Sequence, residues 1–110
     1  PTTLVGQVTT TSPKGRDEAW SGKPIKVSEM LATIDGAKFV ERVAVNSPAG
    51  IRKAKAAIKK CFEYQIEGKG FGIVEVLSTC STNWGMTPVE AMKWVDDNMI
   101  PYYPLGRIKE

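Results

Sequence analysis

The sequence predicts an α/β protein in which two parallel strands flank one long helix. Residues 39–45 are mostly β-branched or aromatic, and residues 73–77 form a nearly continuous apolar run, as in strands covered on both faces. Between them, Ser47-Pro48 is a typical helix start, with serine as the cap and proline in the first turn. A strand, helix and strand of these lengths form a right-handed βαβ unit, so we expect parallel strands flanked by helices.

The chain before the first strand contains a loop and a short helix. Residues 1–24 are rich in Thr, Ser, Gly and Pro and show little periodicity, which indicates a loop. We predict a helix over residues 26–35, ended by Gly36, because apolar residues recur there at helical spacing. These residues are Val27, Met30, Leu31 and Ile34.

The helix after Ser47 has an apolar face and a basic face. We expect the apolar face, which includes Cys61, to be buried. It consists of Ile51, Ala54, Ile58, Cys61 and Phe62. The basic residues are Arg52, Lys53, Lys55, Lys59 and Lys60. Because no aromatic residues are interleaved among these, we interpret the basic face as solvated rather than as a nucleic-acid surface.

Glycines and prolines mark the ends of the remaining elements. Gly68, Gly70 and Gly72 precede a strand, whereas phosphate-binding loops follow a strand and open a helix, so we interpret them as turn residues. The segment Thr87-Pro88-Val89-Glu90 is a capping box that starts another helix. Its inward positions are expected to be Val89, Met92, Val95 and Met99. Pro101 and Pro104 then predict an extended end over residues 100–105.

The predicted elements leave polar and apolar groups that need partners. Glu75 interrupts the second apolar strand, and we expect it to pair with Arg42 on the first, with a place in an active-site cleft as the alternative. Two parallel strands also leave both sheet edges open and apolar surface exposed. We therefore expect self-association of the chain or the addition of a partner strand.

Composition narrows the classes of function. A chain of 110 residues forms one small domain or part of a larger one, and its net charge of +3 is too balanced to indicate a nucleic-acid partner. No apolar run reaches the length of a membrane span and no secretion signal is seen, so we expect a cytoplasmic location where Cys61 and Cys80 stay reduced. The absence of histidine excludes serine–histidine and cysteine–histidine catalysis within this chain.

Cys80 is the strongest candidate for a functional residue. It lies in the run VLSTCSTNW, residues 76–84, just where the second apolar strand ends. Ligands of open α/β sheets gather beyond the carboxyl ends of the strands, so a thiol at this position is presented rather than packed. A cysteine without a role in a polar loop is the alternative.

Much of the sequence resembles a known enzyme family. The stretch GIVEVLSTCSTNWGMTPVEAMKWVDDNMIPYYPLG, residues 72–106, resembles the C-terminal part of the β subunit of 2-oxoacid:ferredoxin oxidoreductases, which binds thiamine diphosphate. Pro1-Thr2-Thr3 resembles the end of a family segment that follows the cofactor-binding motif. The resemblance implies part of a thiamine-diphosphate-binding fold, with residues 1–24 as the loop after that motif and residues 25–110 as the C-terminal α/β part of a longer subunit.

The resemblance also implies a function. The chain would be a segment of an enzyme complex of anaerobic metabolism that oxidatively decarboxylates a 2-oxoacid to acyl-CoA and reduces ferredoxin. The 2-oxoacid would be 2-oxoglutarate or a branched-chain acid. The implied partners are the N-terminal part of the β subunit, α-, γ- and δ-type subunits, ferredoxin and coenzyme A, with no membrane and no nucleic acid. We expect the isolated chain to be inactive.

Three residues gain roles from the resemblance. Cys80 would be the fourth ligand of a four-iron, four-sulfur cluster, although Thr79 and Ser81 stand where the family often has proline. Thr2 and Thr3 would lie near the diphosphate of the cofactor. The acidic motif that holds magnesium is absent from this chain, so we expect the chain alone to hold neither the cofactor nor the cluster. The resemblance assigns no catalytic residue.

The residues alone leave other classes of function open. One is a stand-alone module that binds a protein or a nucleic acid through its basic helix or its open sheet edge. Another is a structural association domain in which Cys80 has no role. Substitution of Cys80 by serine separates these from the oxidoreductase, because loss of a cluster is expected only in the enzyme.

Overall fold

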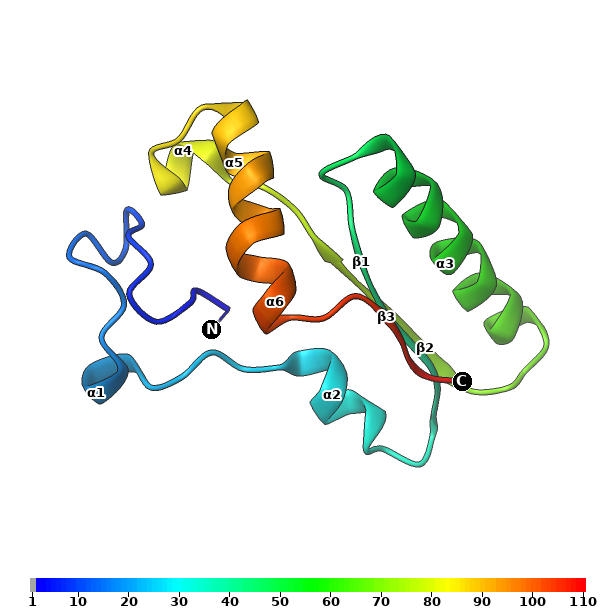
Figure 1. Cartoon of the computed structure of the whole chain (residues 1–110). Coiled ribbons are helices and arrows are strands. Elements are labelled where there is room, and N and C mark those ends of the chain that lie inside the picture. The colour runs from blue at the N-terminus through cyan, green and yellow to red at the C-terminus, as the bar shows by residue number, and fades with distance from the viewer. Residues whose placement is uncertain (1) are drawn as a thin grey trace.

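The computed structural model describes residues 2–110, and Pro1 lies outside the described residues. It contains a three-stranded sheet in the order β2-β1-β3, with helices on both faces (Figure 1). β1 (Ala37–Ala44) pairs in parallel with β2 (Phe71–Leu77), and α3 (Pro48–Ile66) connects them. The predicted α/β class and its parallel strand–helix–strand unit are therefore confirmed.

The prediction that both sheet edges are open is wrong for one edge. β3 (Gly106–Lys109) pairs antiparallel with β1, so β1 is the central strand and β2 keeps a free edge. The side chain of Arg107 in β3 bonds to Glu41 of β1, with 2.6 Å between Nε and Oε1. This strand was missed because its four residues, Gly-Arg-Ile-Lys, show neither an apolar run nor an alternating pattern.

α3 packs on the sheet through small residues. Its N-terminus is capped as predicted, since the Gly50 N–H donates to Ser47 Oγ at 3.0 Å. Ala54 and Ala57 are buried against Val43 of β1, and these alanines bring the helix backbone close to the sheet. The larger residues of the predicted apolar face lie at its margin and are exposed, contrary to the prediction. These are Ile51, Ile58 and Phe62.

A short helix, α2 (Val27–Ala32), covers the opposite face of the sheet, whereas two others, α1 (Glu18–Ser21) and α4 (Ser81–Trp84), lie away from the strands (Figure 1). α2 is shorter than the predicted residues 26–35. α1 is a single turn within the N-terminal loop, and α4 follows β2. The second core cluster contains Ala44, Leu77 and Tyr103.

The last helix is longer than expected. α5 (Pro88–Trp94) continues through a π-helical turn, η1 (Val95–Met99), into α6 (Ile100–Tyr102). Residues 100–102 are therefore helical rather than extended. Pro101 has no backbone N–H to donate, and the π-helical turn before it changes the hydrogen-bonding pattern, so that the helix continues through the proline.

The capping box of α5 is confirmed, but its predicted inward face is wrong in part. The Thr87 N–H donates to Glu90 at 3.0 Å, and the Glu90 N–H donates to Thr87 Oγ1 at 3.2 Å. Val89 and Met92 are exposed, whereas Ala91 and Val95 are fully buried. The buried face of this helix thus contains the small residue Ala91 instead of the larger Val89 and Met92. No helix within residues 2–110 has the length and apolarity needed to cross a membrane.

Candidate functional site

Cys80 lies just beyond the carboxyl end of β2, as the sequence predicted. The four-residue helix α4 begins directly after it and ends at Trp84. Gly85 caps the helix with a φ of 67°, a left-handed conformation that glycine adopts without strain. Cys80 is exposed and is not in a disulfide. Its thiol is therefore available to a ligand that approaches from outside this chain.

Cys61 lies at the other end of β2 and does not contribute to the same site. It is half-buried on α3, and a Cβ atom added to Gly72 near the start of β2 would come within 2.7 Å of its Sγ. Within residues 2–110, no group of three or more Cys, Asp or Glu side chains is arranged to hold a metal ion. At this position the described residues thus offer one exposed thiol, and a four-iron cluster bound there would need its other ligands from elsewhere.

Thr2 and Thr3 are fixed through their backbone carbonyl groups. The Tyr103 hydroxyl donates to the Thr2 carbonyl at 3.0 Å, and Nη1 of Arg16 donates to the Thr3 carbonyl at 2.9 Å. Arg16 also donates to the carbonyls of Ser21 and Gly22, each at 3.0 Å. The guanidinium group of Arg16 therefore organises the N-terminal segment around Thr3.

Thr3 borders a polar cavity of about 630 Å³. Hydroxyl groups and two basic residues surround it, and no acidic side chain does. The lining residues are Thr3, Thr11, Ser12, Arg16, Ser21, Lys23 and Ile25. Hydroxyls and cations suit a phosphate group, whereas the carboxylates that would hold its magnesium are not among the lining residues. The donor set therefore fits one side of a diphosphate but not its metal ion.

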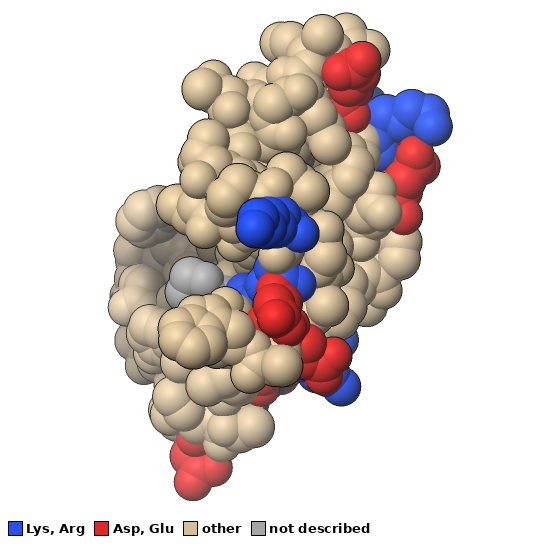
Figure 2. Space-filling view, turned by 90° about the vertical axis from the view of Figure 1, so that its left-hand side faces the viewer, with Lys and Arg blue, Asp and Glu red and all other residues tan. Residues whose placement is uncertain are grey.

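The N-terminal segment also contacts the turn that carries Cys80. The Thr10 N–H donates to the Asn83 backbone carbonyl at 3.0 Å and to Asn83 Oδ1 at 3.2 Å, and the Thr10 hydroxyl also donates to Oδ1. Beside this contact, a groove of about 350 Å³ separates residues 4–8 from Trp84 and Trp94, whose rings lie 5.0 Å apart. Figure 2 looks onto this side of the molecule, where much of the surface is uncharged and is hollowed.

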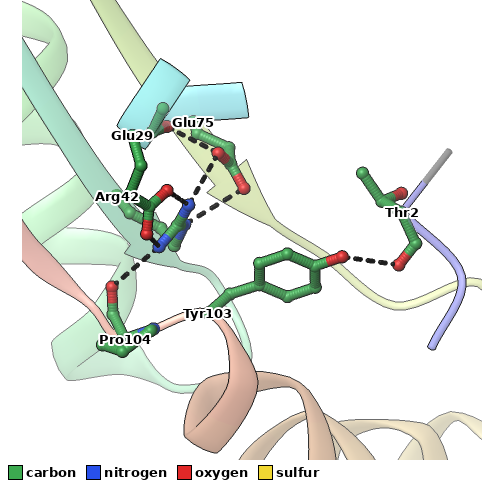
Figure 3. A network of polar contacts seen from close by, with 7 residues as sticks. Thr2, Glu29, Arg42, Glu75, Tyr103 and Pro104 are labelled. Carbon is green, nitrogen blue, oxygen red and sulfur yellow. Dashed lines mark hydrogen bonds and ion pairs between the residues drawn. The ribbon is translucent and has the colours of Figure 1, made fainter. Parts of the chain in front are cut away.

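A buried ion network lies on the face of the sheet opposite α3 (Figure 3). Arg42 is 1% exposed, and its Nε donates to Glu75 at 3.1 Å while its Nη1 donates to Glu29 at 2.9 Å. It also donates to the Pro104 carbonyl at 3.2 Å and lies 5.3 Å from the centre of the Tyr103 ring. The predicted pairing of Glu75 with Arg42 is confirmed. Arg42 therefore joins α2, both parallel strands and the segment before β3.

The network changes the protonation of its members. Burial alone would lower the pKa of Arg42, but hydrogen bonds with Glu29 and Glu75 outweigh it and raise that pKa. The hydrogen bond from Arg42 lowers the pKa of Glu29. Burial raises the pKa of Tyr103 to about 12. At neutral pH the Arg42 cation thus lies beside an ionised Glu29 and a neutral Tyr103 hydroxyl.

Comparison with curated proteins finds relatives that match most or all of the chain. The ketoisovalerate oxidoreductase subunits VorA of Methanothermobacter marburgensis and Methanothermobacter thermautotrophicus are each 40% identical to it over all 110 residues. The 2-oxoglutarate synthase subunit KorB of Archaeoglobus fulgidus is 34% identical over 98 residues, 89% of the chain. The chain is homologous to 2-oxoacid:ferredoxin oxidoreductase subunits. The predicted resemblance to this family is therefore confirmed, whereas the type of subunit stays a prediction.

This 2-oxoacid oxidoreductase homologue matches only part of each relative. It spans 23% of the length of the two VorA proteins and 32% of the length of KorB. No family model matches it, and neither does a solved structure.

The structure brings some candidate residues of this oxidoreductase homologue into one region. Thr2 and Thr3 begin the segment whose Thr10 contacts the Cys80 turn, so the two predicted sites are linked through one stretch of backbone. Sequence reasoning missed Thr10, Arg16 and Tyr103. Asn83 lies in the Cys-x-Thr-Asn-Trp motif, which was the one available signal for this contact.

The remaining candidates stay apart from this region. Gly68 and Gly70 have positive φ values of 69° and 139° and lie before β2, so the turn interpretation is confirmed for these two. It is wrong for Gly72, which lies within β2 and is paired with Phe39 of β1. On the basic face of α3, Lys59 pairs with Glu63 at 4.0 Å and Lys60 pairs with Glu110 at 2.6 Å. These partners neutralise part of the basic face and leave it less suited to a nucleic-acid backbone.

Proposed function

We propose that this chain is a segment of the β subunit of a 2-oxoacid:ferredoxin oxidoreductase, which oxidatively decarboxylates 2-oxoglutarate or a branched-chain 2-oxoacid. The products are carbon dioxide, acyl-CoA and reduced ferredoxin. The observation that supports this most strongly is the 40% identity with ketoisovalerate oxidoreductase subunits over all 110 residues. We place the complex in the cytoplasm of an anaerobic cell.

Two cofactors carry the chemistry of this proposed complex. When bound, thiamine diphosphate supplies a carbanion for decarboxylation and a four-iron, four-sulfur cluster supplies a one-electron path to ferredoxin. We assign Cys80 as one thiolate ligand of the cluster, because it is exposed at the end of β2. We assign Thr2 and Thr3 to the diphosphate side, supported by the hydroxyl-lined cavity that Thr3 borders.

The chain's own residues bind and orient in this proposal. Arg16 holds the Thr3 carbonyl at 2.9 Å, and Tyr103 holds the Thr2 carbonyl at 3.0 Å, so both threonines keep a fixed backbone position. No side chain is assigned to proton transfer. The remaining part of the β subunit and the α-, γ- and δ-type subunits supply the other cluster ligands and the magnesium site, and ferredoxin and coenzyme A are the soluble partners.

The experiment that tests this function is replacement of the candidate ligand. The Cys80→Ser variant of the assembled complex is purified anaerobically, and its iron content and visible absorption are compared with those of the parent. Loss of about one four-iron cluster per β subunit is expected. Cys61→Ser is the matched control, because Cys61 packs against Gly72 at the far end of β2 and should leave the iron content unchanged. Unchanged iron in Cys80→Ser would contradict the assignment.

A stand-alone binding module fits the comparisons less well. Such a module would use the basic face of α3 or the free edge of β2. The homologues are instead subunits of 2-oxoacid oxidoreductases, and ion pairs already occupy Lys59 and Lys60 of that face. The free β2 edge is better explained as a surface on which the chain self-associates or adds another strand.

A further inference from the structure

Thr10 and Asn83 form a polar bridge between segments that are 73 residues apart in sequence. The Thr10 backbone donates to the Asn83 carbonyl at 3.0 Å, and both the N–H and the hydroxyl of Thr10 donate to Asn83 Oδ1. We propose that Asn83 is a positioning residue, which holds the Cys80 turn in a fixed place relative to the N-terminal segment. Its side chain supplies the acceptor for two of the three hydrogen bonds.

The position of Asn83 is transmitted to Cys80 within one helical turn. Asn83 belongs to α4, and the next residue, Trp84, donates its N–H to the Cys80 carbonyl at 3.0 Å. The Met86 N–H donates to the Ser81 carbonyl at 2.9 Å, which closes the same turn. These hydrogen bonds join residues 80–86 into one unit, so a change in the position of Asn83 also changes the position of the Cys80 backbone.

Side-chain packing does not replace this bridge. Next to it, a groove of about 350 Å³ lies between residues 4–8 and the side chains of Trp84 and Trp94. Val5 and Val8 in this stretch are 47% and 55% exposed, so they bury little surface against α4. Because apolar contact is weak here, hydrogen bonding to Asn83 decides how the segment and the turn are aligned.

Other hydrogen bonds hold the N-terminal segment in place, so the Thr10 side of the bridge is fixed as well. Tyr103 holds the Thr2 carbonyl and Arg16 holds the Thr3 carbonyl. The backbone of Arg16 accepts from the Gly6 N–H at 2.8 Å and donates to the Gln7 carbonyl at 3.1 Å. The bridge thus fixes the Cys80 turn relative to the cavity that Thr3 borders. Its meaning for electron transfer rests on the proposed function, whereas the mechanical coupling does not.

The test compares isosteric variants that remove or keep the acceptor. In the assembled complex, Asn83→Leu removes both hydrogen bonds to Oδ1, whereas Thr10→Val removes only the one from the Thr10 hydroxyl. Asn83→Asp keeps an oxygen acceptor, and Thr82→Ala is the control on the same short helix. Hydrogen exchange is measured by mass spectrometry for residues 2–12, 78–86 and, as a reference, α3. The midpoint potential of the cluster is measured by redox titration followed by electron paramagnetic resonance.

We expect Asn83→Leu to accelerate exchange about fivefold in both residues 2–12 and residues 78–86, with α3 unchanged. Thr10→Val should accelerate exchange in the same two segments by a smaller factor, because its backbone N–H still reaches Oδ1. The double variant should not exceed Asn83→Leu, and Asn83→Asp should keep exchange slow. The midpoint potential should shift in Asn83→Leu and by less in Thr10→Val, because hydrogen bonding and solvent exposure near a ligand set this potential. Asn83→Asp is used in the exchange measurement alone, since its added negative charge itself changes the potential.

Two results would overturn the inference. One is unchanged exchange at residues 78–86 in Asn83→Leu, and the other is equal acceleration in α3, which indicates general destabilisation. Failure of the proposed function looks different: Cys80→Ser would then keep its iron, while the exchange of residues 2–12 and 78–86 would still respond to Asn83 and support the bridge.

Discussion

The two faces of the sheet are closed in different ways. On the α3 face, contact is made by small apolar residues, with Ala54 and Ala57 against Val43. On the opposite face, Arg42 is buried among Glu29, Glu75 and the Pro104 carbonyl. Within residues 2–110 no buried side-chain nitrogen or oxygen lacks a hydrogen-bond partner, so this polar face is fully satisfied.

This difference shows how uniquely each face is specified. An apolar contact tolerates sliding, because dispersion has no direction, whereas a guanidinium group needs its carboxylates at fixed positions. The polar face therefore defines one arrangement of α2, β2 and β3. The α3 face leaves an apolar margin, in which Phe62 is 66% and Ile66 is 85% exposed. The polar face is self-contained, whereas the α3 face has apolar surface left for contact with another chain.

The largest expected effect comes from removing the guanidinium group. Arg42→Met leaves the carboxylates of Glu29 and Glu75 without their cation, which should lower the free energy of unfolding by about 3–5 kcal/mol. Urea denaturation followed by circular dichroism measures this. Lys93→Met is the control, since its pair with Asp97 is exposed on both sides and its loss should change stability far less.

A triple variant sharpens this test. Replacing Arg42 by Met together with Glu29→Leu and Glu75→Leu removes the whole ion network, including the unpaired charges. If the loss in Arg42→Met comes from stranded carboxylates, the triple variant should recover most of the stability. If the triple variant is no more stable than Arg42→Met, then side-chain packing, rather than charge pairing, stabilises this face of the sheet.

Alkaline pH should weaken the polar face through Tyr103. Its pKa is raised by burial to about 12, above the usual value of about 10, so the folded state favours the neutral hydroxyl. The stability that this contributes, up to about 2 kcal/mol, is complete below about pH 10 and is lost as the pH rises towards 12. Urea midpoints at several pH values should fall more steeply in the parent than in Tyr103→Phe. Parallel slopes would contradict the assignment.

A smaller effect is expected on the α3 face from Gly72→Ala. The added Cβ would lie 2.7 Å from Cys61 Sγ, so the chain must shift, at a cost of about 1–2 kcal/mol. Cys61→Ala removes the obstructing sulfur and should rescue the variant. Thermal unfolding of both single variants and the double variant gives the coupling energy between the two positions. Additive effects would mean that the helix and the strand do not meet there.

The smallest effect on stability is expected at the exposed margin. Phe62→Glu should change the free energy of unfolding by no more than about 0.5 kcal/mol, because the side chain is mostly solvated. It should, however, reduce self-association of the isolated chain, as seen by light scattering over a concentration series. Lys59→Glu, which lies on the solvated face of α3, is the control. If the parent chain stays monomeric at high concentration, the exposed margin of α3 is not a surface for self-association.

The sequence predicted the elements that are encoded locally. Ser47 and Thr87 mark helix starts because their side chains bond to nearby N–H groups, and both caps are present. Glu75 was expected to find Arg42 because a carboxylate inside an apolar strand needs a cation, and the two are paired. Each prediction depends on residues that are neighbours in sequence or in the predicted register of adjacent strands.

What was missed depends on contacts that no local pattern contains. β3 exists because β1 offers a free edge, and its own four residues carry no strand signal. At the candidate site, the exposed position of Cys80 followed from its place after a strand. Its link to Thr10 did not, because that hydrogen bond joins residues 73 positions apart.

The long reach of Arg42 also has a consequence for the order of folding. Its hydrogen-bond partners are 13, 33 and 62 residues away along the chain, so the last of these bonds can close only after most of the polypeptide has been brought together. We therefore expect this contact to contribute little to the transition state of folding. Substitutions at Arg42 should therefore act mainly by accelerating unfolding. The Arg42 side chain would thus control the lifetime of the native state through the unfolding rate.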